Sequence, residues 1–138
     1  MAAFNKFNNF IADVYNGVHD LSSDTLKIAL TTHANKPIST NSILADLTTI
    51  SLANLNTDTI TTVSSSQVSG VYQLILDDLI VTASGNVGPF RWAVIYNDSS
   101  TNKSLVGYFD YGQDLTLTAG KTFKFNFSSN LISASWKA

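Results

Sequence analysis

The stretch Thr122-Phe-Lys-Phe-Asn-Phe127 alternates strictly between aromatic and polar side chains. Phe123, Phe125 and Phe127 must lie on one face of an extended chain, because successive side chains of a strand point to opposite sides. The polar positions between them lie on the other face. This pattern is typical of a β-strand with one buried side.

The same plan recurs through most of the chain and predicts a mainly β protein. Short apolar runs, separated by turns rich in Gly, Asn, Asp and Ser, favour an antiparallel β-sandwich or jelly roll of about eight strands in one domain, residues 1–138. The expected strands are Thr25–Thr31, Thr59–Ser64, Val71–Leu76, Phe90–Tyr96, Ser104–Tyr111, Leu115–Leu117, Thr122–Phe127 and Leu131–Ser135. Phe90–Tyr96 is apolar at nearly every position, which predicts a central strand covered on both faces.

Only the N-terminal segment has a helical period, and it predicts an amphipathic helix over about residues 3–18. The apolar positions at spacings of three and four are Phe4, Phe7, Phe10, Ile11, Val14, Tyr15 and Val18. Such a stripe needs a cover, either the sheet of the same chain or a neighbouring subunit. A membrane surface is a weaker partner, because Lys6 is the only basic residue before His19.

Three segments are less regular. Ile43–Ile50 fits either a short helix or an edge segment. The run Ser64-Ser65-Ser66-Gln67 and Gly70 predict an irregular connection between two strands. The buried parity of the run Tyr72–Ala83 slips by one residue at Asp77-Asp78, which predicts a β-bulge there.

Composition excludes several classes of partner. The formal net charge is −2, and the eight Lys and Arg residues are scattered, so there is no electrostatic footprint for nucleic acid. The chain has no cysteine, which excludes disulfides and thiolate metal sites. No apolar run approaches the roughly 20 residues needed to span a bilayer, and the N-terminus lacks the pattern of a signal peptide.

Candidate catalytic groups are few. His19 and His33 are the only imidazoles, and no Gly-x-Ser-x-Gly elbow accompanies them. Asp77 and Asp78 are adjacent, so on a regular strand they would point to opposite faces and could not flank one glycosidic bond. We therefore expect no catalytic residues and no enzyme activity.

Ligand-binding groups are equally sparse, and we expect no metal or other cofactor. His19-Asp20 with Asp24 lacks a recognised metal spacing, and Asp110 and Asp114 are typical of a turn. Trp92 and Trp136 are the aromatic candidates for sugar binding, with core packing as the ordinary alternative for Trp92.

Three segments carry a resemblance to a known group of proteins. They are Leu21-Ser-Ser-Asp-Thr-Leu-Lys-Ile-Ala-Leu-Thr-Thr32, Gly88-Pro-Phe-Arg-Trp-Ala-Val-Ile-Tyr-Asn-Asp98 and Leu105-Val-Gly-Tyr-Phe-Asp-Tyr-Gly112. With the Phe-rich N-terminus, they resemble small virion structural proteins of tailed bacteriophages, over nearly the whole chain. The resemblance brings no catalytic residues and no motif of defined function.

The resemblance implies a capsid cement or decoration protein, made in the bacterial host cytoplasm and carried on the virion surface. Its partner would be the major capsid protein, and such proteins often form homotrimers. A tail or receptor-binding component, or a carbohydrate-binding module, is the alternative. The residues expected at an interface are Phe4, Phe7, His33, Lys36, Pro37, Asn102, Lys103 and Trp136.

Overall fold

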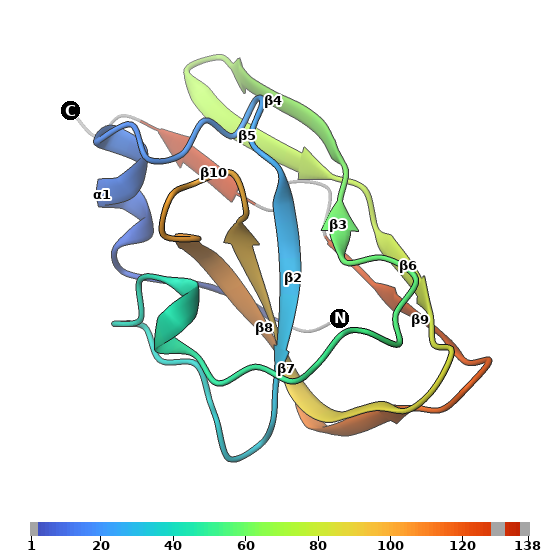
Figure 1. The fold of residues 1–138 in the computed structure, drawn as a ribbon. Coiled ribbons are helices and arrows are strands. Elements are labelled where there is room, and N and C mark those ends of the chain that lie inside the picture. The colour runs from blue at the N-terminus through green and yellow to red at the C-terminus, as the bar shows by residue number, and fades with distance from the viewer. Residues whose placement is uncertain (1–2, 128–131, 136–138) are drawn as a thin grey trace.

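A computed structural model describes residues 3–127 and 132–135 and shows a mainly β protein with antiparallel strand pairing (Figure 1). The largest sheet has the order β1 (Ala3–Lys6), β8 (Leu105–Leu117), β7 (Val87–Asn97), β2 (Leu26–Thr31) and β3 (Thr59–Ile60). A second sheet has the order β10 (Ile132–Ser135), β5 (Val71–Leu76) and β4 (Thr62–Val68), and β6 (Leu79–Thr82) pairs with β9 (Thr122–Phe125). The predicted mainly β, antiparallel class is confirmed.

Strand β7 is the centre of the five-stranded sheet, as its continuous apolar run predicts. It pairs with β2 on one side and with β8 on the other. Residues 92–97 are all buried, because both faces of this strand are covered. Ala93 and Ile95 belong to the main core, whereas Val94 and Tyr96 belong to a second apolar cluster on the opposite face.

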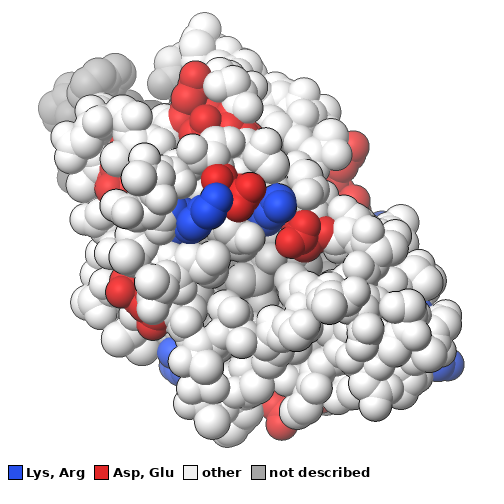
Figure 2. Space-filling model, viewed as in Figure 1, with Lys and Arg blue, Asp and Glu red and all other residues white. Residues whose placement is uncertain are grey.

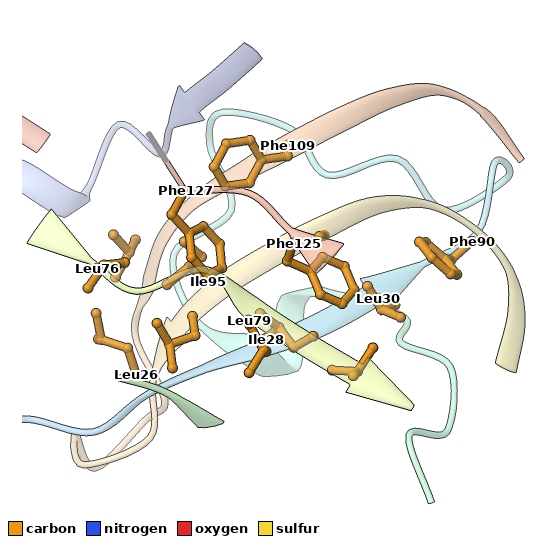
Figure 3. Packing of buried hydrophobic residues seen from close by; sticks show 14 of the residues in the cluster. Leu26, Ile28, Leu30, Leu76, Leu79, Phe90, Ile95, Phe109, Phe125 and Phe127 are labelled. Carbon is orange, nitrogen blue, oxygen red and sulfur yellow. The ribbon is translucent and has the colours of Figure 1, made fainter. Parts of the chain in front are cut away.

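The main core joins the five-stranded sheet to the two smaller sheets (Figure 3). Leu26, Ile28 and Leu30 project into it from β2, and Leu76, Leu79 and Phe125 meet them from the smaller sheets. Leu26, Leu30 and Phe125 are fully buried. Each fully buried side chain of this size contributes about 1.5–3 kcal/mol relative to an exposed one, so this layer holds the sheets together.

The prediction of an N-terminal helix over residues 3–18 is wrong in the length of the helix. Residues 3–6 form strand β1, and the helix α1 covers only Phe10–Tyr15. Residues 3–6 form a strand and not a helix because their backbone pairs with the edge of β8. Phe4 then packs on Phe109, with ring centroids 5.1 Å apart. Gly107 makes room for this contact, since a Cβ there would lie 2.7 Å from the Asn5 carbonyl oxygen.

The chain does not form a bulge at Asp77-Asp78 but changes sheets there. Strand β5 pairs with β4 and β10, whereas β6 pairs with β9. The predicted slip in parity is real, because Leu74, Leu76, Leu79 and Val81 are all buried. Two strands in different sheets can each bury their own alternate positions, so no extra residue is needed in a single ladder.

The predicted irregular connection at residues 64–67 is also wrong, because these residues belong to β4. The turn lies later, at Ser69 and Gly70, with φ angles of 51° and 82°. Two positive φ angles between strands identify a two-residue hairpin loop of the tight, type I′ kind. For residues 43–50 the sequence predicts either a short helix or an edge segment. The structure shows one turn of 3-10 helix at Leu44–Asp46.

Candidate interaction surface

Helix α1 divides the apolar residues of its segment between the interior and the surface. Phe10 is 5% exposed and belongs to the core, and Val14 packs against that core. Ile11 and Val18 are 52% and 37% exposed, and Tyr15 between them is 68% exposed. Ile11 and Tyr15, at i and i+4, lie on one side of α1. Val18 follows the end of the helix, after Gly17 with a φ of 78°, so it is exposed in the turn and does not continue the helical face.

An apolar cavity adjoins Ile11, between α1 and the sheet of β4, β5 and β10. Its volume is about 310 Å³. Its lining residues are Phe10, Ile11, Val14, His19, Asp20, Leu21, Ser22, Ser65, Tyr72 and Ile132. Tyr72 and Ser65 share a hydrogen bond of 2.7 Å between their hydroxyls, and burial raises the pKa of Tyr72. We call the cavity together with the exposed part of Ile11 the α1 patch.

A buried polar network supports the wall of the cavity at His19. The Asn97 side-chain amide donates to His19 Nδ1 at 2.9 Å and to Asp24 Oδ2 at 2.6 Å. Asn97 Oδ1 accepts from the Ser99 N–H at 3.0 Å, which fixes the orientation of the amide. Because His19 Nδ1 must accept, the imidazole is neutral and carries its proton on Nε2, 4.0 Å from Asp13 Oδ2.

This network makes stability depend on pH. Burial lowers the pKa of His19 below its ordinary value of 6.5, against the raising effects of Asp13 and Asp24. The folded chain therefore binds a proton less readily than the unfolded chain, and the free energy of unfolding should fall as pH drops below about 6.5. Urea unfolding between pH 7.5 and pH 5.5 measures the slope.

The matched control for that slope is His19→Gln, which keeps a hydrogen-bonding side chain but cannot titrate. We expect a shallower slope in the variant over the same pH range, since the carboxylates that remain titrate mainly at lower pH. Equal slopes in both proteins would contradict the assignment of His19 as a buried neutral acceptor.

A second hollow, of about 550 Å³, lies on the other side of α1 and is mostly polar. It is lined by Asn9, Asp13, Gly17, Val18, Ser42, Ile43, Ser99, Ser100, Thr101, Asn102 and Ser104. Three segments far apart in sequence meet there, because Leu44 N–H donates to the Lys103 carbonyl and Asn8 N–H to the Ser39 carbonyl. Asp13 is the only charged residue among the lining residues.

Lys103 is held within the β7–β8 loop. Its ammonium lies 2.9 Å from Asp98 Oδ1 and donates to the Asp98 carbonyl at 2.7 Å. This lysine lowers the pKa of the Asp98 carboxyl. Lys27 lies between Asp98 and Asp58, at 3.7 and 3.9 Å. The alternating row of acidic and basic side chains in Figure 2 is therefore internally neutralised and gives no single-sign patch.

Arg91 organises a third polar cluster at the opposite end of β7. It donates from Nε and Nη2 to the two carboxylate oxygens of Asp110, at 2.8 and 3.2 Å. This bidentate pair lowers the pKa of Asp110. The guanidinium lies 4.8 Å from the Trp92 ring centroid, and His33 Nδ1 is 3.2 Å from Arg91 Nη1. Trp92 is only 2% exposed, so it offers no open platform for a sugar ring.

The eight residues expected at an interface fall into separate places. Phe7 and Pro37 are buried, and Phe4 is half-buried against β8, so these three face the chain's own interior. His33, Lys36 and Asn102 are exposed, and Lys103 is engaged with Asp98. Trp136 lies outside the described residues.

The sequence patterns did not reveal the network of His19, Asn97 and Asp24. Asn97 and His19 are 78 positions apart, and the pairing of Leu26 with Asn97 brings β7 near the segment that precedes β2. The available signals are the closeness of His19 and Asp24 in the sequence and the polar residue that ends the apolar run of β7. Ile11 and Val18 were expected, but as part of a covered stripe.

Comparisons with protein-family models, with curated proteins and with solved structures found no match to this chain. In the part of the chain that the structure describes, no three His, Asp or Glu side chains gather in a way that could hold a metal ion. Within the same residues, no helix is long and apolar enough to cross a membrane.

Proposed function

We propose that this chain is a structural virion protein of a tailed bacteriophage, a capsid cement or decoration protein. It binds the outer face of the shell and clamps neighbouring copies of the major capsid protein. The resemblance of residues 21–32, 88–98 and 105–112 supports the class, and the α1 patch supports a role in binding. The observation that carries the proposal is that half-exposed Ile11 lines an apolar cavity beside α1.

The α1 patch has the features of a surface that binds another protein. Exposed apolar residues that are contiguous with a recess mark protein–protein contact sites more often than isolated ones do. A partner side chain inserted into the cavity would bury Ile11 further. The polar hollow on the other side of α1 would then supply a hydrogen-bonding rim, as in ordinary protein interfaces.

The remaining expectations belong to the same proposal. They are a β-sandwich of jelly-roll type, assembly as a homotrimer, synthesis in the bacterial host cytoplasm, and a final location on the virion surface. Many identical weak contacts around a shell would give avidity without a deep binding site in any one subunit.

The test compares two exposed isoleucines. Ile11→Asp places a charge in the α1 patch, whereas Ile80→Asp places one on β6, where Ile80 is 60% exposed. Capsids assembled without this protein are mixed with each variant, and bound protein is measured by cosedimentation. Loss of one buried isoleucine contact corresponds to about 1.5–3 kcal/mol, so Ile11→Asp should bind roughly ten- to a hundredfold more weakly.

Wild type and Ile80→Asp should bind with equal affinity and raise the temperature at which the capsid disassembles. Both substitutions replace exposed side chains, so both variants should keep the unfolding temperature of the wild type. Wild-type protein that does not bind, or equal affinity of the two variants, would contradict the proposal.

A further inference from the structure

Strand β4 is an open edge of the sheet with the order β10, β5 and β4. It pairs with β5 on one side only, and the hairpin of the two strands projects at the top of Figure 1 with β4 outermost. Among the described residues, no backbone hydrogen bond reaches the other side of residues 62–68. An edge of this kind is a template for another strand.

The two-residue turn identifies which backbone groups face outward. Val68 and Val71 flank Ser69-Gly70, and in a tight hairpin this flanking pair exchanges both hydrogen bonds. Hydrogen-bonded and non-bonded pairs alternate along an antiparallel ladder. Ser66 and Ser64 are therefore bonded to β5, whereas the N–H and C=O groups of Ser65 and Gln67 point to the open edge.

This edge lacks most of the features that usually prevent pairing. The hairpin from Thr62 to Leu76 contains no charged residue and no proline. By contrast, β1 carries an exposed Lys6 and β9 an exposed Lys124. A register irregularity at Val63 shortens the regular part of β4, but Ser64–Val68 remains straight against β5. Val63 and Val68, at the two ends of the strand, are 56% and 54% exposed.

We propose that β4 pairs antiparallel with β4 of a second copy of this chain, around a two-fold axis beside Ser65. The occupant is a second copy because an uncharged strand is compatible with itself: a two-fold axis sets each side chain against a neutral one. Pairing would join two three-stranded sheets into one continuous sheet. It would satisfy the outward N–H and C=O groups of Ser65 and Gln67 in both copies.

The contact is small, so it should be weak in free solution and favoured where copies are crowded. A single strand pair buries far less than the roughly 1,200 Å² of a stable interface. Copies held side by side on a surface have a high effective concentration and would associate more completely. The proposal does not depend on the capsid proposal and is tested with the isolated protein.

Amide hydrogen exchange measured by NMR at low and at high protein concentration is the direct test. At low concentration, Ser65 and Gln67 amides should exchange quickly and Ser64 and Ser66 amides slowly. At high concentration, Ser65 and Gln67 should slow at least tenfold while Ser64 and Ser66 change little. Sedimentation should show the average mass rising about twofold over the same range. Exchange rates at Ser65 and Gln67 that do not depend on concentration would overturn the proposal.

Two variants separate strand pairing from other association. Ser65→Pro removes an outward N–H and the hydroxyl bond to Tyr72 but no backbone hydrogen bond to β5, and it should abolish the rise in mass. Ser65→Lys keeps every N–H and sets two like charges across the two-fold axis, so it should weaken association even if the proline variant does not fold. Ile80→Asp, on β6, should associate like wild type. Association that survives Ser65→Lys, or is lost in Ile80→Asp, would place the contact elsewhere.

Discussion

Phe90→Ala should lower the free energy of unfolding by about 3–5 kcal/mol, the largest single effect that we expect in this protein. Phe90 is fully buried. Its ring lies 5.9 Å from that of Phe123 and 6.4 Å from those of Tyr111 and Phe125. The four rings come from β7, β8 and β9, so truncation leaves a cavity that no single strand can close by moving.

Chemical denaturation followed by tryptophan fluorescence or circular dichroism measures this loss. Ile80→Ala is the control, because Ile80 is 60% exposed and its truncation should change the free energy of unfolding by no more than about 0.5 kcal/mol. A loss below about 1 kcal/mol for Phe90→Ala would mean that the aromatic cluster is not the packed centre of this end of the core.

Asn97→Asp should be the second most damaging substitution, and should cost more than Asn97→Ala. Asn97 is fully buried, and its side-chain amide donates hydrogen bonds to both His19 and Asp24. Alanine leaves the buried His19 Nδ1 without its donor, at about 1–3 kcal/mol, whereas the partly exposed Asp24 Oδ2 still accepts from the Asp20 N–H. Aspartate also removes the donor and sets a second carboxylate at the 2.6 Å contact with Asp24, where two like charges repel.

Equilibrium unfolding at neutral pH ranks the two variants. The deficit of Asn97→Asp relative to wild type should narrow as pH is lowered toward about 4, because a carboxylate pair can then share a proton. Asn102→Asp is the matched control: Asn102 is exposed in the neighbouring loop, and the change should be within about 0.5 kcal/mol. An Asn97→Asp protein as stable as the Asn102→Asp protein would disprove the network.

The strands that could be predicted are those whose burial follows from local alternation. Residues 26–31 carry a large aliphatic side chain at every second position, and residues 122–125 alternate polar with aromatic side chains. Residues 90–96 are apolar at every position except Arg91, so the sequence pattern identifies all three segments as strands. The parity slip at Asp77-Asp78 was also visible. Its cause was not, because a bulge and a change of sheet leave the same pattern in a single strand.

The N-terminal segment shows where local pattern fails. Phe4, Phe7 and Phe10 at a spacing of three fit a helix, yet the first two lie in and just after a strand segment. The asparagines between them have low helix propensity, and the open edge of β8 offers backbone hydrogen bonds in their place. The predicted strand that ends at Ser64 is too short for a similar reason. The serine-rich sequence of residues 64–66 resembles a loop, and only the pairing with β5 shows that it is part of β4.

The candidate surface was predictable in part. The apolar residues Ile11, Tyr15 and Val18 can be identified from the sequence, but their exposure depends on how much of the segment the sheet covers. The burial of Trp92 beneath Arg91 and His33 depends on the pairing of β7 with β2 and β8. A tryptophan next to an arginine carries no signal of its own that distinguishes a binding platform from a covered ring.

The order of the strands also bears on how the chain can acquire its shape during synthesis. The last two strands supply Phe125 and Ile132 to the interior and are partners of β6 and β5, which precede them by dozens of residues. While β9 and β10 are still inside the ribosome, β6 and β5 lack these partner strands, and the core lacks Phe125 and Ile132. The interior that the described residues form therefore closes only once β9 and β10 have paired with β6 and β5.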